Sequence, residues 1–177
     1  MGLQIVKTLE EIKAQIVDVP DFPKSGIIFK DITPVLADHL SFKSLCLHFS
    51  ELVPKNATKI VAIESRGFLL GAALSQHLHL GLVLVRKPGK LPRKAHKISY
   101  QLEYGSDSLE LHETDLTKND KVVIIDDVLA TGGTARATEE LVKKTGAEIL
   151  QHIFLMEIDF LKGREKLIAP SKALFQV

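Results

Sequence analysis

Two adjacent carboxylates followed by a short glycine-containing loop are the residues of this chain best suited to chemistry. The string VVIIDDVLATGGTARAT at residues 122–138 runs from four β-branched apolar residues into Asp126 and Asp127. The loop that follows is Ala130, Thr131, Gly132, Gly133 and Thr134. Its N–H groups and the start of the helix expected after it can hold a phosphate. The carboxylates can accept hydrogen bonds from sugar hydroxyls. A sugar phosphate would therefore suit both the acid pair and the glycine-containing loop.

Other interpretations of this string are weaker. No Gly-Lys-Ser/Thr sequence follows the glycines, so it is not a Walker loop, and the spacing is not that of a GxGxxG fingerprint. A buried strand with an acidic helix cap and a flexible turn would explain a lone Asp-Asp or Gly-Gly pair. The complete string, with threonines on both sides of the glycines, favours function.

The segment IIDDVLATGGT closely resembles the phosphoribosyl pyrophosphate (PRPP) motif of type I phosphoribosyltransferases. This resemblance implies that Asp126 and Asp127 bind the ribose hydroxyls. It also implies that residues 130–134 bind the 5-phosphate of PRPP.

A second loop of the same kind lies in IVAIESRGF, where a short apolar run ends at Glu64-Ser65-Arg66-Gly67. Such a loop can offer N–H groups to a second phosphate while Arg66 supplies a planar cationic fork. The alternative is a surface ion pair at the start of a helix, which contributes little to stability. The family resemblance makes this the pyrophosphate-binding loop, with a non-proline cis peptide near Glu64-Ser65.

The basic segment VRKPGKLPRKAHK follows another apolar run. A pyrophosphate leaving group needs cations, and Arg86, Lys87 and Lys90 are the residues expected to supply them. Arg93 and the lysines at 94 and 97 are expected to be solvated. The alternatives are a solvated loop throughout, or a weak patch for nucleic acid.

Two further segments resemble the adenine-specific members of the family. They are RKPGKLP…YQLEYG with LELH, and the hood segment DFPKSGIIFKDITPVL. The first implies that Glu103 exchanges a proton with the base and that Tyr104 closes over the site as part of a flexible loop. Taken without the resemblance, these residues would form a plain hairpin with outward polar side chains.

The hood segment implies that the backbone around residues 28–30 reads the base and that Phe29 stacks on it. One peptide N–H and one C=O match the acceptor N1 and the 6-amino donor of adenine. Phe29 could otherwise be a core aromatic residue. Lys30 stands where relatives commonly have Arg, which puts a bidentate phosphate contact from this side chain in doubt.

Composition sets the remaining limits. The chain has 177 residues, 45% hydrophobic and 25% charged, as in an ordinary globular domain. Lys and Arg number 23 against 22 Asp and Glu, so no general nucleic-acid footprint is expected. The single cysteine, Cys46, excludes an internal disulfide and a multi-cysteine zinc site. With no signal peptide pattern and no apolar run of membrane-spanning length, we expect a cytoplasmic protein without a membrane partner.

The order of expected elements positions these motifs. We expect strands at 59–63, 82–85, 121–125, within 148–158 and at 172–177. Helices are expected at 5–16, 67–79 and 134–144. A further helix is expected to begin with Ser41 as its N-cap and to end at about 52. Residues 21–34 and 86–99 are expected to be loops, and 100–104 with 108–112 a hairpin around the turn 105–107. Alternating strands and helices predict an α/β fold, a mainly parallel sheet flanked by helices. We expect one domain, with a small N-terminal hood over about residues 1–35, a core over about 36–177 and a flexible β-hairpin loop.

The resemblance implies a purine salvage enzyme that converts adenine and PRPP into AMP and pyrophosphate. Mg²⁺ would arrive bound to PRPP and leave with pyrophosphate, without a dedicated protein metal site, and the enzyme would be a homodimer. One alternative is a transferase for 6-oxopurines. Another is a regulator that senses PRPP or purine and binds DNA, although few residues precede the hood for a DNA-reading module.

Overall fold

The computed structural model describes residues 6–102 and 105–177 of the chain. Contacts between residues group the chain into two units, one ending at Glu51 and one beginning at Leu52. Each unit has its own secondary structure, and the second contains the phosphate-binding motifs predicted from the sequence.

The N-terminal unit begins with a capped helix. Its elements are α1 (Leu9–Lys13), β1 (Val17–Pro20), β2 (Ile28–Asp31), α2 (Thr33–Ala37) and α3 (His39–Leu52). The hydroxyl of Thr8 accepts the N–H of Glu11 at 3.2 Å, and the Glu11 carboxylate accepts the N–H of Thr8 at 2.8 Å. This capping box satisfies donors that the first helical turn would otherwise leave unpaired.

Three predictions for this unit were wrong. The helix expected over 5–16 covers only Leu9–Lys13 among the described residues. Residues 21–34 are not all loop, because β2 pairs antiparallel with β1 and places Phe29 opposite Val19. Ser41 is not the N-cap of α3, which begins at His39. Asp38 accepts the N–H of Ser41 at 2.7 Å instead, so the preceding acid supplies the oxygen that the sequence pattern assigned to serine.

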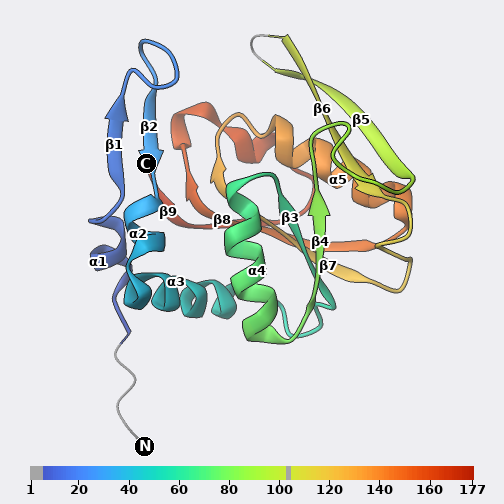
Figure 1. Ribbon diagram of the computed structural model, residues 1–177, viewed down its shortest axis with the longest axis horizontal. Helices are drawn as coiled ribbons and strands as arrows, with labels where there is room; N and C mark the ends of the chain where they lie inside the picture. The colour runs from blue at the N-terminus through green and yellow to red at the C-terminus, as the bar shows by residue number, and fades with distance from the viewer. Residues whose placement is uncertain (1–5, 103–104) are drawn as a thin grey trace, which may run out of the picture. The chain divides into compact units, whose positions relative to one another are not determined.

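Within residues 52–102 and 105–177, five parallel strands form the main sheet in the order β4-β3-β7-β8-β9 (Figure 1). The elements of this second unit, in chain order, are β3 (Lys59–Ile63), α4 (Arg66–Leu78), β4 (Gly81–Val85), β5 (Ala95–Leu102), β6 (Gly105–His112), β7 (Lys121–Leu129), α5 (Gly133–Thr145), β8 (Glu148–Glu157), the 3₁₀ turns η1 (Asp159–Leu161) and η2 (Gly163–Lys166), and β9 (Ser171–Gln176). The predicted parallel sheet flanked by helices is therefore confirmed.

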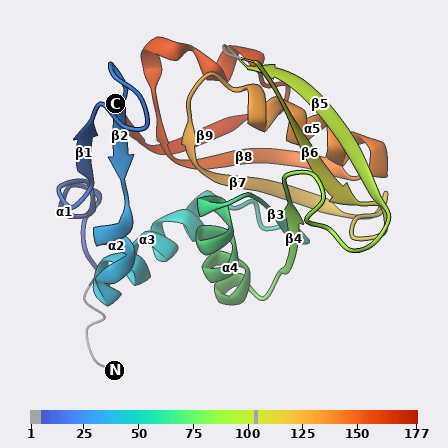
Figure 2. The same cartoon turned by 45° about the horizontal axis from the view of Figure 1, so that its top comes forward.

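Helix α4 covers one face of this sheet, and α5 with the β5–β6 hairpin covers the other (Figure 2). On the α5 side, alternate residues of β3 and β4 join Leu141 and Val142 of α5 in one buried cluster. On the α4 side, a Cβ at Gly71 would lie 2.6 Å from the Cβ of Ala62, so glycine is needed for helix and strand to approach this closely.

The hairpin is longer than the sequence predicted. Its strands pair from Ala95 opposite His112 to Leu102 opposite Gly105, so part of the expected loop 86–99 and the expected turn 105–107 are strand. Ile98 packs against the buried cluster that contains Leu109 and Leu111, while Lys97 and Ser99 are exposed. The basic and polar residues of this segment concealed an alternating pattern whose inward face is apolar.

Strand β7 extends further than predicted, so Asp126 and Asp127 lie inside it rather than after it. It pairs with β3 as far as Ile125 but with β8 as far as Leu129. The acids therefore lie beside the point where β3 ends and its loop begins. In a doubly wound sheet, this edge is where ligands bind.

The described helices include none that is both long enough and apolar enough to cross a membrane.

Candidate active site

A cavity of about 570 Å³ lies at this edge of the sheet. Its lining comes from the β3–α4 loop, the segment after β4, the hairpin, β7 and the start of α5, and includes Arg66, Lys87, Tyr100, Asp107, Asp126 and Thr134. Residues from separate predicted motifs therefore meet around one space.

The two acids of β7 differ in their surroundings. Asp127 is buried, with its Oδ2 2.7 Å from Nε of Arg66. Asp126 accepts the N–H of Asp127 at 2.9 Å and lines the cavity. Burial and then the neighbouring charge of Asp127 raise the pKa of Asp126 well above its ordinary value. A ligand whose hydroxyl groups donate hydrogen bonds to Asp126 would replace the hydrogen bonds from water that this carboxylate loses on burial.

Gly67 lets α4 begin directly against these acids. A Cβ at this position would lie 2.9 Å from Oδ1 of Asp126 and 2.9 Å from the carbonyl oxygen of Ile125. No other residue type fits without moving β7, so the glycine after Arg66 sets the distance between the two predicted phosphate loops.

The loop at residues 130–134 leads into α5 as predicted. Gly132 caps the helix with a φ of +78°, a left-handed conformation that favours glycine. All five predicted residues, Ala130, Thr131, Gly132, Gly133 and Thr134, line a small cavity of about 80 Å³ that they share with Asp126. A small anion in this cavity would face the N-terminal end of α5.

A second glycine supports this loop from behind. A Cβ at Gly132 would strike the carbonyl oxygen of Gly163 in η2, and a Cβ at Gly163 would strike the carbonyl oxygen of Ala130. Arg164 fixes this segment because Nε lies 3.1 Å from Oε1 of Glu157 and Nη2 also bonds Oε2. The C-terminal segment FLKGREKL therefore packs directly on the loop predicted to bind phosphate.

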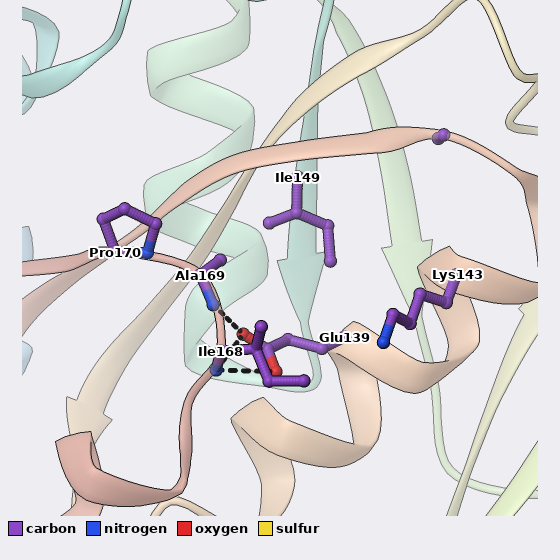
Figure 3. Close-up of a pocket in the computed structure, with 7 residues that line it drawn as sticks. Glu139, Lys143, Ile149, Ile168, Ala169 and Pro170 are labelled. Carbon is purple, nitrogen blue, oxygen red and sulfur yellow. Dashed lines mark hydrogen bonds between the residues drawn. The ribbon is translucent and has the colours of Figure 1, made fainter.

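Glu139 ties α5 to the same segment. Its buried carboxylate accepts the N–H of Ala169 at 2.9 Å and of Ile168 at 3.1 Å (Figure 3), a ring nitrogen of His152 lies 2.9 Å away, and Arg136 lies 2.9 Å away. Burial alone would raise the pKa of Glu139, but the hydrogen bonds from His152 and the two backbone groups outweigh it and lower the pKa to about 2.

Beside Glu139 lies a mainly apolar cavity of about 360 Å³ (Figure 3). Lys143, Ile149 and Pro170 contribute to its lining. None of the described residues predicted to bind substrate lines it, and the carboxylate of Glu139 is already fully engaged by protein donors. We therefore assign Glu139 a structural role behind the phosphate loop.

The predicted pyrophosphate end is organised around Glu64. Its carboxylate accepts the N–H of Lys87 at 2.9 Å, and it lies 3.3 Å from Nε of Arg86 and 3.4 Å from Nζ of Lys90. Burial opposes ionisation of Glu64, yet these donors together lower its pKa below the ordinary value. The side chains of Arg86 and Lys90 therefore converge on Glu64, whereas Lys87 meets it through its backbone N–H and directs its ammonium group to Asp107. The peptide bond Glu64-Ser65 is cis, as the resemblance implied.

The remaining predicted residues belong to the N-terminal unit or lie outside the described residues. Phe29 packs edge-to-face on Phe22 at 5.1 Å, and Lys30 pairs with Asp18 at 2.7 Å, both within the N-terminal unit. Glu103 and Tyr104 lie outside the described residues. Their predicted roles stay predictions, as do the substrate contacts of the other site residues.

Three residues were not singled out by sequence reasoning: Tyr100 and Asp107 of the hairpin, and Gly163. Glu64 was expected in the second loop, but not as the acid that pairs with Arg86 and Lys90. A hairpin aligned by its apolar residues Ile98 and Leu109 would have placed Tyr100 opposite Asp107. Nothing in the sequence distinguishes Gly163 beyond its place in FLKGREKL, because its contact with Gly132 exists only in the folded chain.

The fold and the site define a phosphoribosyltransferase. The sequence model of the phosphoribosyl transferase domain matches residues 36–175, so the chain belongs to this family.

Relatives narrow this assignment. An adenine phosphoribosyltransferase of Geobacter metallireducens is 54% identical over 160 residues, which are 90% of this chain and 94% of the relative. The crystal structure of adenine phosphoribosyltransferase from Thermoanaerobacter pseudethanolicus superposes with a TM-score of 0.94 at 47% identity, covering 96% of this chain and all of that one.

The Saccharomyces cerevisiae enzyme, solved with an imino-altritol bisphosphate and adenine, superposes with a TM-score of 0.89 at 43% identity, covering 94% of this chain and 97% of its own. These relatives are adenine phosphoribosyltransferases, as the hood and hairpin segments predicted. They favour an adenine-specific transferase over a transferase for 6-oxopurines or a regulator that senses PRPP or purine.

Proposed function

We propose that this protein is an adenine phosphoribosyltransferase, which joins adenine to C1 of PRPP and releases pyrophosphate to give AMP. One observation carries the proposal: the acid pair, the glycine loop and the cations after β3 and β4 converge at one edge of the sheet. PRPP is a ribose with a phosphate at one end and a pyrophosphate at the other. The glycine loop would bind the phosphate, the acid pair the ribose hydroxyls, and the cations the pyrophosphate.

The residues present can lower the barrier at C1. As the bond to pyrophosphate breaks, C1 becomes oxocarbenium-like and negative charge grows on the leaving group. Arg66, Arg86 and Lys87 would stabilise this charge, since fixed cations near a developing anion act strongly in a site shielded from water. Binding of the distant 5-phosphate by residues 130–134 would hold C1 in position, which uses binding energy for orientation.

Mg²⁺ would come to this site as part of the substrate. Among residues 6–102 and 105–177 there is no group of three or more histidine, cysteine, aspartate or glutamate side chains that could hold a metal ion. Mg²⁺ commonly keeps substrate phosphates and water among its ligands, with one or two carboxylates. Asp126, which lines the cavity, would be the carboxylate that meets such an ion or its water. When bound, the ion would neutralise pyrophosphate and template its departure.

For the base, the proposal rests on the sequence. Phe29 would stack on adenine, and the backbone around residues 28–30 would read its N1 and 6-amino group. Closure of the segment 88–104 over the site, with Tyr104 as part of the lid, would exclude the water that hydrolyses PRPP. The homodimer and the cytoplasmic location stay predictions, and light scattering tests the first.

The direct test measures pyrophosphate release from PRPP and Mg²⁺ with adenine, hypoxanthine, guanine or xanthine supplied separately. The proposal requires release with adenine, AMP as the product, and little release with the three other bases. Folded protein that releases no pyrophosphate with any base would refute it.

Glu103 is proposed to handle the proton of adenine. Glu103→Gln should lower kcat by about 100-fold and change the KM for PRPP by less than about threefold, because general acid–base catalysis contributes this much without binding PRPP. The matched control is Glu113→Gln, a change just beyond the hairpin, where the acid pairs with Lys94 at 3.1 Å. An unchanged kcat in Glu103→Gln would remove this residue from the mechanism.

A further inference from the structure

Tyr100 and Asp107 form a cross-strand pair on the hairpin. They stand opposite each other in the antiparallel register of β5 and β6, so their side chains share one face. Both line the 570 Å³ cavity. The pair therefore presents one hydroxyl and one carboxylate to the space in which the proposed function places PRPP.

The Tyr100 hydroxyl contacts the phosphate loop. Its oxygen lies 3.2 Å from Oγ1 of Thr134, the last residue of that loop. Burial raises the pKa of Tyr100, so the phenol keeps its proton. A phenol is a better donor than an aliphatic hydroxyl. Donation from Tyr100 to Thr134 leaves the proton of Thr134 free to point at a phosphate oxygen.

The Asp107 carboxylate contacts the opposite end. Its Oδ2 lies 3.5 Å from Nζ of Lys87, and its Oδ1 accepts the N–H of Ser108 at 2.8 Å. Lys87 lines the cavity beside Glu64, at the end where pyrophosphate is expected, and its backbone N–H donates to that carboxylate. An acid at this position competes with pyrophosphate for the ammonium group and repels its charge, and the effect is modest because the pair is partly exposed.

We infer that this pair adjusts the two ends of the PRPP site in opposite directions. Tyr100 strengthens binding of the 5-phosphate by orienting Thr134, and Asp107 weakens retention of pyrophosphate by competing for Lys87. Both are positioning residues. Asp107 favours the release of pyrophosphate after it has left C1. The inference rests on the proposed function, which supplies the two anions.

The test uses the two halves of PRPP as separate probes. Calorimetric titration measures the Kd of ribose 5-phosphate and of pyrophosphate with Mg²⁺ on the full chain at low ionic strength. The variants are Tyr100→Phe and Asp107→Asn, with Asp107→Ser as a second form of the latter. The control is Ser108→Ala, which removes a hairpin hydroxyl that contacts Ser99 at 2.8 Å rather than the cavity.

Tyr100→Phe should weaken ribose 5-phosphate by about 3–10-fold, as expected for one lost hydrogen bond, and leave pyrophosphate within about twofold. Both Asp107 variants should tighten pyrophosphate by about 3–10-fold and leave ribose 5-phosphate within about twofold. A hairpin that is merely destabilised would move both probes together. That result, or a change under twofold in either expected direction, overturns the inference.

Catalysis by the wild-type chain separates the two proposals. If the unaltered protein forms AMP from adenine and PRPP but the variants do not show opposite effects, only the inference on the pair fails. If the unaltered protein forms no AMP and binds neither probe, the proposed function fails and the inference fails with it.

Discussion

The two ends of the site that are proposed to bind the 5-phosphate and the pyrophosphate are built from different kinds of chemical group. The 5-phosphate end consists of backbone and small side chains, with Gly132 packed against Gly163 and α5 fixed by Glu139. The proposed pyrophosphate end consists of long cationic side chains paired with acids, Arg86 and Lys90 with Glu64 and Lys87 with Asp107, and the Lys87 side chain is 56% exposed. The first end would therefore recognise its anion by shape, and the second by charge.

This difference follows from what each end must do. The 5-phosphate stays bound throughout the proposed reaction, so a rigid cradle whose N–H groups are already aimed suits it. Pyrophosphate must bind and then leave. Cations held by an internal acid can take up the anion and return to the acid afterwards. We therefore expect changes at the first end to act on packing, and changes at the second to act on charge.

The largest expected effect is that of Gly132→Ala. A Cβ at Gly132 meets the carbonyl oxygen of Gly163 and must also occupy a φ of +78°. We expect kcat/KM for PRPP to fall by about 100-fold or more, and the free energy of unfolding to fall by about 2–4 kcal/mol. Steady-state kinetics and urea unfolding measure the two effects.

Gly146→Ala is the matched control. Gly146 caps the other end of α5 with a φ of +82°, but a Cβ there meets nothing closer than 3.4 Å. It should cost about 1–2 kcal/mol of stability and leave kcat/KM within about twofold. Equal kinetic losses in the two variants would show that the left-handed backbone, and not the contact with Gly163, accounts for the effect at Gly132.

Glu139→Gln should come next, with a loss of about 2–4 kcal/mol in the free energy of unfolding. The amide cannot accept all the hydrogen bonds that the buried carboxylate receives from Ile168, Ala169 and the His152 ring. Chemical unfolding at pH 7 measures this change. A loss under about 0.5 kcal/mol would contradict the structural role of Glu139.

The same residue predicts a pH dependence. The pKa of Glu139 falls from 4.5 to about 2 on folding, so its stabilisation is present above pH 4.5 and is lost as the pH falls toward 2. The raised pKa of Asp126 has the opposite effect on the pH dependence of stability. Because Asp126 is common to both proteins, the difference in unfolding free energy between wild type and Glu139→Gln should shrink over this pH range. A constant difference would refute the assignment.

The smallest effect is expected at the charged end. Lys87→Gln should raise the KM for PRPP by about 3–10-fold at low ionic strength, and the increase should shrink at 0.5 M salt, since exposed charges are screened at roughly that concentration. Lys94→Gln is the control, because Lys94 is 85% exposed and pairs with Glu113. If the effect of Lys87→Gln does not depend on salt, this end does not act through charge.

The sequence predicted best what lies in contiguous motifs. The apolar run of β7, its two acids and the loop of Gly132 are adjacent in the chain, so their chemistry could be inferred without knowing the fold. The parallel sheet followed from the alternation of strands and helices.

Contacts between distant segments could not be predicted in this way. A glutamate on α5 is typical of a solvated helix face, and only the folded chain brings Ile168 and Ala169 to Glu139. Asp107 belongs to a Gly-Ser-Asp sequence that favours a turn, but burial of Leu109 and Leu111 beside Ile98 fixes it in a strand. Tertiary packing decided both cases.

The most direct test of this account compares the two halves of PRPP on two variants, the isosteric Thr134→Val and the charge-removing Lys87→Gln. Titration gives the Kd of ribose 5-phosphate and of Mg²⁺-pyrophosphate for each. We predict that Thr134→Val weakens ribose 5-phosphate by about tenfold or more and leaves pyrophosphate within about twofold, and that Lys87→Gln weakens pyrophosphate alone. If both variants weaken both probes equally, or each weakens the other's probe, the assignment of the two ends is contradicted.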